Sequence, residues 1–495
     1  MKKPFSMLIA GLIVFSGTLQ ASNFVYTNND VIGANSVSAF SVDAGGVLTE
    51  IPNSPFLTGG GGTGGGGFAI NRVAVAGSGK YLYVSNGGTY DISAFIIDAT
   101  TGGLTLLAGS PFPTGTAIFG DISLAAAAEG GFLFAGVASN RTVVTFRIGA
   151  DGSLAQMSSV PVPAAPEGMK ATNDGLYLAV ALPSFAGGAI AMFSIAANGG
   201  LTLVNNFPFV GAGLVTGVDI NCAGSQLFGG RLSQTGMFVD AYAIGAGGVL
   251  SKIPGSPFSS STGLNSATVL LSTDDKRLFV GNQISNTVAV FDIDSTGALT
   301  MVGNAPFPID LLSANPAGMA TDQAGAFLYV ASSPGLIQVF GIGADGTLTP
   351  TADSPFSTGQ GNTLLSLAAF PAKGCGAGPG GEPPPPPVIS GLPGEGCTLW
   401  PPDSQFIEVG TVSAADKLSG LASFEVTGTS NERSRRNDPD VVITGTGLEP
   451  RTVFLRAARL GAEKGRIYTL TATAKNLAGE MTTSTTTCTV PHDQR

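Results

Sequence analysis

The sequence has one histidine in 495 residues, and that residue, His492, lies close to the C-terminal end. Imidazole is the side chain that most often moves protons in catalysis near neutral pH. A site formed by any earlier part of the chain must therefore use other acids and bases. Only four cysteines are present, so ligand sets for haem, copper or zinc are also missing, and we expect no metal site and no cofactor.

Charged residues are scarce as well, at 11% of the chain, while hydrophobic residues make up 43% and glycine contributes 72 residues. Disordered chains show the opposite balance, so this composition predicts a folded protein rich in tight turns and β-strands. The charges are unbalanced, because residues 22–388 contain 10 basic and 21 acidic side chains. Such a surface repels phosphate groups, which argues against nucleic acids and anionic lipids as partners.

Long hydrophobic runs are absent beyond the first residues. Lys2 and Lys3 precede an apolar stretch from Met7 to Phe15, and Leu19-Gln20-Ala21 is a suitable cleavage site. The stretch is too short to span a bilayer, so residues 1–21 are predicted to be a signal peptide. We expect the mature protein to be secreted, periplasmic or associated with the cell surface, without a transmembrane segment.

Seven copies of one pattern follow. Each copy contains a strand-like segment such as Tyr81-Leu82-Tyr83-Val84-Ser85-Asn86, then a second one such as Val288 to Asp294. A turn with glycine and a leucine come next, and a proline followed by a hydrophobic residue closes the copy. The closing pairs are Pro55-Phe56, Pro111-Phe112, Pro161-Val162, Pro208-Phe209, Pro257-Phe258, Pro306-Phe307 and Pro355-Phe356.

The repeat length of about 50 residues fits four antiparallel strands with their turns, which is the size of one propeller blade. The closing proline belongs on an outer strand, where a missing N–H is harmless. Helical solenoids are excluded because no 3.6-residue period is sustained; an array of β-sandwiches is the remaining alternative. We predict an all-β fold with a seven-bladed β-propeller over residues 22–371.

The innermost strand of each blade is expected just before the aromatic segment, as in Arg72 to Ala76. The first copy lacks this strand, whereas an unpaired one, Leu364 to Phe370, follows the seventh copy. We predict that this last strand completes the first blade and latches the ring, because an open sheet edge would otherwise remain. Truncation before Leu364 should then lead to aggregation or proteolysis.

The segments Tyr83-Val84-Ser85-Asn86, Ala94 to Asp98 and Gly103-Leu104-Thr105 resemble the consensus blade of the YVTN repeat family and of the seven-bladed lactonase-like propellers. The resemblance covers residues 23–371 and implies the fold. Its motifs are strand cores and turns, so they carry little information on activity. Enzymes of this group include 6-phosphogluconolactonase-like and carboxymuconate-cyclase-like members. The resemblance therefore implies a site made of polar residues in the central channel, with histidine among them.

The family pattern often places a histidine at the start of the innermost strand, and this chain has other residues there. The matching positions are Arg72, Ser123, Gly168, Gly217, Thr268, Gly318, and Leu365 or Ser366. Acidic residues lie at or near three of these positions. Two interpretations of the acidic residues are open: they line a polar mouth suited to a lactone or a sugar, or they cap turns and solvate the rim. The candidate binding residues at the mouth are Arg72, Asp121, Ser123, Glu167, Asp219 and Thr268, and none is assigned a catalytic role.

The run Gly59 to Gly67 joins an outer strand to the next inner strand. It lacks the Lys-Ser/Thr pair and the helix of a phosphate-binding loop. We predict a flexible insertion at the channel mouth, where it can act as a mobile flap.

Residues 372–394 are rich in glycine and proline and are predicted to be an extended linker. Residues 395–495 contain candidate strands whose number and spacing fit a β-sandwich. These are Phe406 to Val412, Ser423 to Thr427, Val441 to Thr444, Val453 to Leu460, Ile467 to Thr473 and Thr482 to Val490. The two ends of this region, Cys397 to Pro402 and Cys488 to Gln494, resemble an immunoglobulin-like accessory module of exported bacterial proteins.

Cysteine use is compatible with an oxidising compartment. A bridge between Cys397 and Cys488 would tie the first segment of the module to its last strand, and Cys375 with Cys397 is the competing pair. Cys222 is interpreted as a small hydrophobic residue buried in an inner strand.

Two functions remain. The first is a non-catalytic, monomeric propeller that binds a carbohydrate, a lactone or an envelope protein at the cell envelope or outside the cell. The alternative is a secreted lactonase with an atypical, histidine-free site. Glycine, serine and threonine at the channel positions favour the first function, whereas convergence of Arg72 and Glu167 would favour the second.

Overall fold

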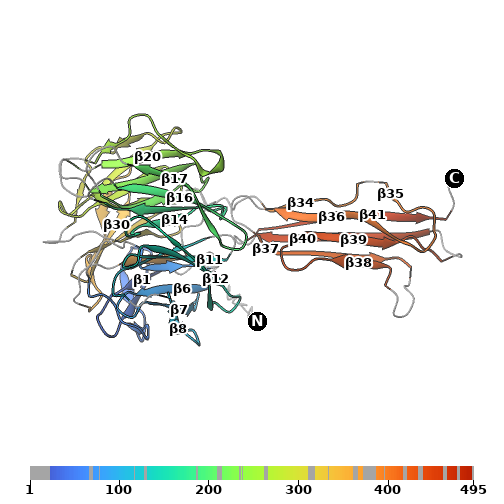
Figure 1. The fold of residues 1–495 in the computed structure, drawn as a ribbon, viewed down its shortest axis with the longest axis horizontal. Coiled ribbons are helices and arrows are strands. Elements are labelled where there is room, and N and C mark those ends of the chain that lie inside the picture. The colour runs from blue at the N-terminus through green and yellow to red at the C-terminus, as the bar shows by residue number, and fades with distance from the viewer. Residues whose placement is uncertain are drawn as a thin grey trace, which may run out of the picture.

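The computed structural model shows two β-sheet bodies, a propeller and a C-terminal sandwich (Figure 1). The described residues form strands and one short 3-10 helix, η1 (Ala246–Gly248). Within them, no helix is long and apolar enough to cross a membrane. The structure describes residues 23–65, 71–76, 79–115, 118–127, 131–184, 188–208, 214–232, 236, 238–260, 266–309, 318–332, 334–360, 366–371, 386–394, 396–415, 421–432, 439–460, 465–476 and 480–492.

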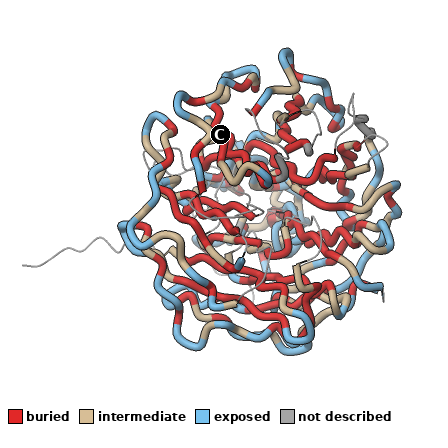
Figure 2. The backbone as a smooth tube through the Cα atoms, turned by 90° about the vertical axis from the view of Figure 1, so that its left-hand side faces the viewer, coloured by how far each residue is buried: buried red, intermediate tan, exposed pale blue. Residues whose placement is uncertain are grey.

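Seven antiparallel sheets form the propeller, and each runs from an inner strand through a second and a third strand to an outer one. Figure 2 shows the blades as a ring whose strands are mostly buried and whose peripheral turns are exposed. The inner strands are β33 (Ser366–Phe370), β5 (Val73–Val75), β10 (Ile122–Ala126), β14 (Met169–Ala171), β18 (Leu214–Ile220), β23 (Ser266–Leu271) and β28 (Met319–Thr321). The second strands are β1 (Asn23–Asn28), β6 (Tyr81–Asn86), β11 (Phe132–Val137), β15 (Tyr177–Leu182), β19 (Gln226–Leu232), β24 (Arg277–Asn282) and β29 (Phe327–Ser332).

The outer half of each blade contains the leucine and the closing proline of the repeat. The third strands are β2 (Ser36–Val42), β7 (Asp91–Ile97), β12 (Thr142–Ile148), β16 (Ala189–Ile195), β20 (Phe238–Ile244), β25 (Thr287–Ile293) and β30 (Leu336–Ile342). The outer strands are β3 (Leu48–Glu50) with β4 (Phe56–Leu57), β8 (Leu104–Leu106) with β9 (Phe112–Pro113), β13 (Leu154–Pro161), β17 (Leu201–Pro208), β21 (Leu250–Lys252) with β22 (Phe258–Ser259), β26 (Leu299–Met301) with β27 (Phe307–Pro308), and β31 (Leu348–Pro350) with β32 (Phe356–Ser357). The predicted placement of the closing pairs at the outer edge is confirmed for the described residues; Phe209 lies outside them.

The ring closes as predicted. Strand β33, from the end of the repeat region, pairs antiparallel with β1, from its beginning, so that Ser366 lies opposite Asn28 and Phe370 lies opposite Phe24. The rings of Phe370 and Phe24 also stack, with centroids 6.1 Å apart. Strand β33 contacts the inner strands β28 and β5 on its two sides, so the first blade is built from both ends of the propeller.

Buried aromatic side chains fill the spaces between blades. Tyr83 is fully buried, packs with residues of the next blade, and donates a 3.0 Å hydrogen bond to the carbonyl of Gly152 in that blade's hairpin. Tyr26 donates in the same way to Gly102 at 2.9 Å. Gly102 has a φ of 72°, and a Cβ there would lie 2.4 Å from the ring of Phe24. The glycine of the repeat is thus required by both the turn and the packing of the neighbouring blade.

The sandwich consists of two four-stranded sheets around one apolar core. The first sheet contains β34 (Val388–Ser390), β36 (Phe406–Ala415), β39 (Arg451–Arg456) and β38 (Val441–Thr444). The second contains β35 (Cys397–Thr398), β41 (Met481–Pro491), β40 (Gly465–Asn476) and β37 (Leu421–Ser430). Strand β34 lies within the predicted linker but pairs with β36, so the sandwich begins earlier than expected. Its relation to immunoglobulin-like modules stays a prediction.

The disulfide pattern confirms one expectation and corrects another. Cys397 and Cys488 are bonded, with Cα atoms 4.5 Å apart, which excludes Cys397 as a partner of Cys375; Cys375 itself is outside the described residues. Cys222 was expected to be a buried hydrophobic residue of an inner strand, and this is wrong. Strand β18 ends at Ile220, and Cys222 lies half-buried in the following turn and is disulfide-bonded.

Candidate functional site

One residue of each inner strand faces the central channel at the same level. These seven residues all pair with the same position of the second strand, so the repeat itself fixes their level. We call them the channel ring: Ala74, Ala125, Lys170, Asp219, Leu270, Ala320 and Ala368. Five members are apolar, and the two charged ones come from adjacent blades.

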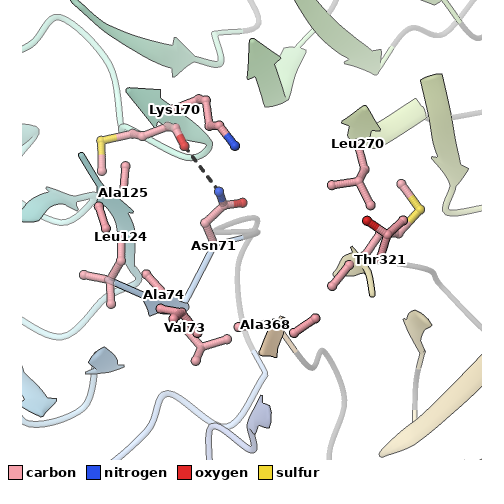
Figure 3. Close-up of a pocket in the computed structure, with 15 residues that line it drawn as sticks. Asn71, Val73, Ala74, Leu124, Ala125, Lys170, Leu270, Thr321 and Ala368 are labelled. Atoms are coloured by element: carbon pink, nitrogen blue, oxygen red, sulfur yellow. Dashed lines mark hydrogen bonds between the residues drawn. The ribbon is translucent and has the colours of Figure 1, made fainter. Parts of the chain in front are cut away.

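A cavity of about 200 Å³ lies within the channel (Figure 3). Its wall is mostly alanine, leucine, valine and methionine, and its polar side chains are those of Asn71, Lys170 and Thr321. Figure 3 shows Asn71 and Lys170 on one side and Thr321 on the other. The Asn71 amide donates to the carbonyl of Met169 at 3.2 Å, whereas the buried Thr321 Oγ1 has no hydrogen-bond partner among the described residues.

A second cavity of about 90 Å³ shares Asn71 and Lys170 with the first and is also lined by Asp219 and Thr268. Lys170 Nζ lies 3.1 Å from the Asp219 carboxylate, and the negative charge of Asp219 raises the pKa of Lys170. The Lys170 side chain is 41% exposed, but that of Asp219 is only 4% exposed. The backbone N–H of Leu271 donates to Asp219 at 2.8 Å, so this carboxylate is fixed by two inner strands and neutralises the channel's lysine.

A second group of charges lies where inner strands β5, β10 and β14 begin. We call it the mouth cluster, and its members are Asp30, Thr63, Arg72, Asp121 and Glu167. Arg72 Nη1 lies 2.6 Å from Asp30 Oδ2, and both side chains are 3% exposed. The Thr63 hydroxyl lies within hydrogen-bond distance of Asp30 and, at 3.3 Å, of Asp121. The loops of three blades are therefore joined by one polar network.

The glycine run belongs to this network, and the expectation of a flexible flap is wrong for its described part. The backbone N–H groups of Thr63 and Gly65 each donate to the Asp30 carboxylate at 2.8 Å, and that of Gly64 donates to the Asp30 carbonyl at 2.9 Å. A Cβ at Gly62 would lie 2.2 Å from the Asp30 backbone. The loop contains glycine because its backbone wraps closely around Asp30. Gly66 and Gly67 are outside the described residues.

Within the mouth cluster, the carboxyl group of Glu167 has a strongly raised pKa. Its residue is 6% exposed, and its Oε2 has no hydrogen-bond partner among the described residues. Burial raises the pKa of Glu167 to about 8, the negative charge of Asp121 adds to the rise, and the Arg72 guanidinium opposes it. At neutral pH this carboxyl is therefore mostly protonated.

The six predicted mouth residues divide into three sets. Arg72, Asp121 and Glu167 come together in the mouth cluster. Asp219 and Thr268 line the smaller channel cavity. Ser123 is buried apart from both, and its hydroxyl lies 3.5 Å from the carbonyl of Gly136.

Five polar residues of the channel and mouth were missed by sequence reasoning: Asp30, Thr63, Asn71, Lys170 and Thr321. Lys170 could have been found, because it lies two residues beyond Gly168 and the side chains of a strand alternate with period two. Asp30 and Thr63 lie in loops that the repeat pattern does not align, and nothing in the sequence marks them.

The chemistry that this arrangement supports is general acid–base catalysis, because Glu167 carries a carboxyl group with a raised pKa and a second carboxyl group, that of Asp121, lies near it. Two acids that are held close but in different environments can serve as base and acid at the same pH. Among the residues that the structure describes, no three Asp, Glu, His or Cys side chains gather as a metal site.

The buried ion pair of the mouth predicts a large effect on stability. Replacement of Arg72 by Met should lower the free energy of unfolding by about 3–5 kcal/mol, because Asp30 would remain as a buried, uncompensated charge. Urea denaturation followed by intrinsic fluorescence measures this loss. The double variant Arg72→Met, Asp30→Asn should recover most of it, and a single variant as stable as the wild type would contradict the prediction.

Comparison with known proteins agrees with this architecture. Residues 242–365 match the profile of the family described as lactonase, 7-bladed beta-propeller. A proposed 6-phosphogluconolactonase from Bacteroides fragilis has a similar structure, with 21% identity and a TM-score of 0.57 over 72% of this chain and 99% of that one. A second proposed 6-phosphogluconolactonase, from Bacteroides uniformis, is 18% identical and has a TM-score of 0.57, over 70% of this chain and 100% of that one. A protein from Lactobacillus plantarum is 17% identical and has a TM-score of 0.52, over 70% of this chain and 99% of that one.

At these identities the structural likeness is one of fold alone. No curated protein matches the chain. The profile match over residues 242–365 and the shared fold agree with the resemblance that the repeats predict: the N-terminal body of this chain has a seven-bladed β-propeller fold similar to that of the lactonase family.

Proposed function

We propose that the mouth cluster catalyses the hydrolysis of a lactone, with Asp121 as general base and Glu167 as general acid. The observation that carries this proposal is the Glu167 carboxyl, which is buried, has no hydrogen-bond partner for Oε2 among the described residues, and has a pKa that burial and the negative charge of Asp121 raise to about 8. The match to the lactonase propeller family supports the same reaction class. The comparisons thus favour the alternative of the two functions considered from the sequence.

The proposed reaction consumes one water molecule. Asp121 accepts a proton from the water as its oxygen attacks the lactone carbonyl carbon. The bond between that carbon and the ring oxygen then breaks, and Glu167 gives its proton to the departing oxygen. The proton on Asp121 returns to Glu167 through solvent, so the product is the open hydroxy acid and both carboxyl groups regain their initial states.

Arg72 acts in this proposal as a positioning residue. Its ion pair fixes Asp30, and Asp30 in turn holds Thr63, whose hydroxyl reaches Asp121. The positive charge of Arg72 also opposes the rise in the pKa of Glu167, which keeps this acid able to release its proton near neutral pH.

Lactone hydrolysis by the mature protein (residues 22–495) tests the proposal. We expect a pH-stat assay with a panel of δ- and γ-lactones to show turnover. Asp121→Asn should lower kcat by a factor on the order of 10² to 10⁴, as removal of a general base does. Asp151→Asn, at an exposed hairpin where the carboxylate accepts hydrogen bonds from the N–H and the hydroxyl of Ser153, is the matched control and should retain activity.

Absence of turnover on the whole panel, or equal rates for Asp121→Asn and the wild type, would refute the proposed function. We also propose that residues 1–21 act as a signal peptide and direct export of the protein. A fusion of residues 1–21 to a reporter enzyme that is active only after export would test this.

A further inference from the structure

Three large apolar side chains are exposed next to the mouth cluster. Ile32, Ile118 and Phe119 are 68%, 55% and 57% exposed, respectively, and we call them the apolar lip. Ile32 is two residues from Asp30, and Phe119 is two residues from Asp121. Large apolar side chains that are exposed together beside a polar site are typical of ligand-binding surfaces.

The lip residues flank the same loop of the mouth. Ile32 pairs with Gly62 through a β-bridge, and a Cβ at Gly64 would lie 2.5 Å from Ile32 Cδ1. On the other side, the N–H of Gly120, next to Phe119, donates to the carbonyl of Gly87. A Cβ at Gly87 would lie 2.5 Å from the Gly120 carbonyl and 2.6 Å from the Thr63 methyl group. Thr63, the residue that joins Asp30 to Asp121, thus follows the glycine that pairs with Ile32 and lies near Gly87, whose carbonyl accepts from Gly120.

The charges near the lip do not favour an anionic ligand. The two cations at the inner strands, Arg72 and Lys170, are each paired with a carboxylate, at 2.6 Å and 3.1 Å. Among the described residues of the mouth cluster and the two cavities, four carboxyl groups, those of Asp30, Asp121, Glu167 and Asp219, stand against these two cations. A phosphate or carboxylate on the substrate would have to displace one of these pairs or accept repulsion.

We propose that the substrate of the mouth cluster is an uncharged lactone with an apolar substituent, alkyl or aryl, which lies on the apolar lip. The carbonyl and ring oxygen face Asp121 and Glu167, and the substituent covers Ile32 and Phe119. The proposal rests on the proposed function, since it names the substrate class of the same site. A substrate of this class differs from phosphorylated sugar lactones in both its charge and its apolar substituent.

Competition between three lactones tests the inference. The wild type is expected to hydrolyse δ-decalactone with a kcat/KM at least about tenfold above its values for glucono-δ-lactone and 6-phosphoglucono-δ-lactone. The double variant Ile32→Ala, Phe119→Ala should lose about tenfold for δ-decalactone and little for glucono-δ-lactone. Leu203→Ala, at an apolar side chain that is 47% exposed on the outer strand β17, is the matched control and should leave both values unchanged.

Binding of δ-lactams, which are not hydrolysed, separates the two proposals. Calorimetry should show that the alkyl-substituted lactam binds the wild type, and that the lip double variant binds it about tenfold more weakly. If this holds but no lactone is hydrolysed, the lip inference stands as a binding preference and the catalytic proposal fails. Faster turnover of the phosphorylated lactone, or equal alkyl-lactam affinity in the wild type and the double variant, would overturn the lip inference while lactone hydrolysis stands.

Discussion

The Glu167→Gln variant is expected to lose lactone hydrolysis by a factor on the order of 10² to 10⁴ while it keeps its fold. Glutamine has nearly the same shape as a protonated glutamic acid, so the buried site accepts it, but it has no acidic proton to give to the ring oxygen. Activity is measured as kcat in a pH-stat at pH 7. Glu50→Gln, at an exposed position of β3, is the control with the same chemical change and should match the wild type.

The pH dependence of the same enzyme gives an independent readout. Activity needs Glu167 in its protonated form, so kcat/KM of the wild type should fall as the pH rises through about 8. The residual activity of Glu167→Gln should lack this decline, once the spontaneous alkaline hydrolysis of the lactone is subtracted. A wild-type profile that stays flat from pH 6 to 10 would exclude Glu167 as the acid.

Stability should change with pH in a way that depends on the same proton. The folded state binds the Glu167 proton more tightly than the unfolded chain, because the pKa rises from 4.5 to about 8 on folding. The resulting stabilisation is complete below pH 4.5 and is lost as the pH rises through 8, with a total on the order of a few kcal/mol. Glu167→Gln should therefore become more stable relative to the wild type over this interval, by thermal melts in matched buffers.

The second large effect concerns the latch. A chain that ends at residue 365 lacks β33, so the ladder edge of β1 loses its partner and the neighbouring inner strands β28 and β5 lose their shared contact. We expect this truncation to aggregate or to be degraded, because the open edge can pair with other molecules. The control chain ends at Pro371, which retains β33 and also lacks the sandwich. Size-exclusion chromatography and limited proteolysis compare the two.

The control isolates the latch from the rest of the C-terminal region, including the sandwich and its disulfide. A chain ending at residue 365 that is soluble and melts cooperatively, like the chain ending at Pro371, would show that ring closure does not require β33. A failure of both chains would assign the effect to the C-terminal region as a whole.

The fold could be predicted because every blade packs against the next one in the same way. Tyr83 and its equivalents have to fill the space to the next blade, and the turn glycine has to admit them, so sequence and structure share one period. The sandwich strands were located, but β36, β37 and β40 are longer than predicted: β40, for example, runs from Gly465 to Asn476, where Ile467 to Thr473 was expected.

The site was predictable only where it follows the repeat. Arg72, Asp121 and Glu167 lie at aligned strand starts, and the structure brings them together. Asp30 lies in a loop of the first blade that the other copies do not match, and its contact with the glycine run depends on the tertiary fold. The disulfide-bonded state of Cys222 shows the same limit, because disulfide connectivity cannot be deduced from sequence alone.

The pairing of Asn28 with Ser366 also sets an order of events for the newly made chain. The first blade cannot be completed until the last strand of the propeller has been synthesised, so β1 must wait for the six blades that follow. Pairings between distant segments of a chain form slowly, because the intervening loop must first be closed. The first blade is therefore the last to be completed, and the ring of the newly made chain stays open until Phe370 has been synthesised.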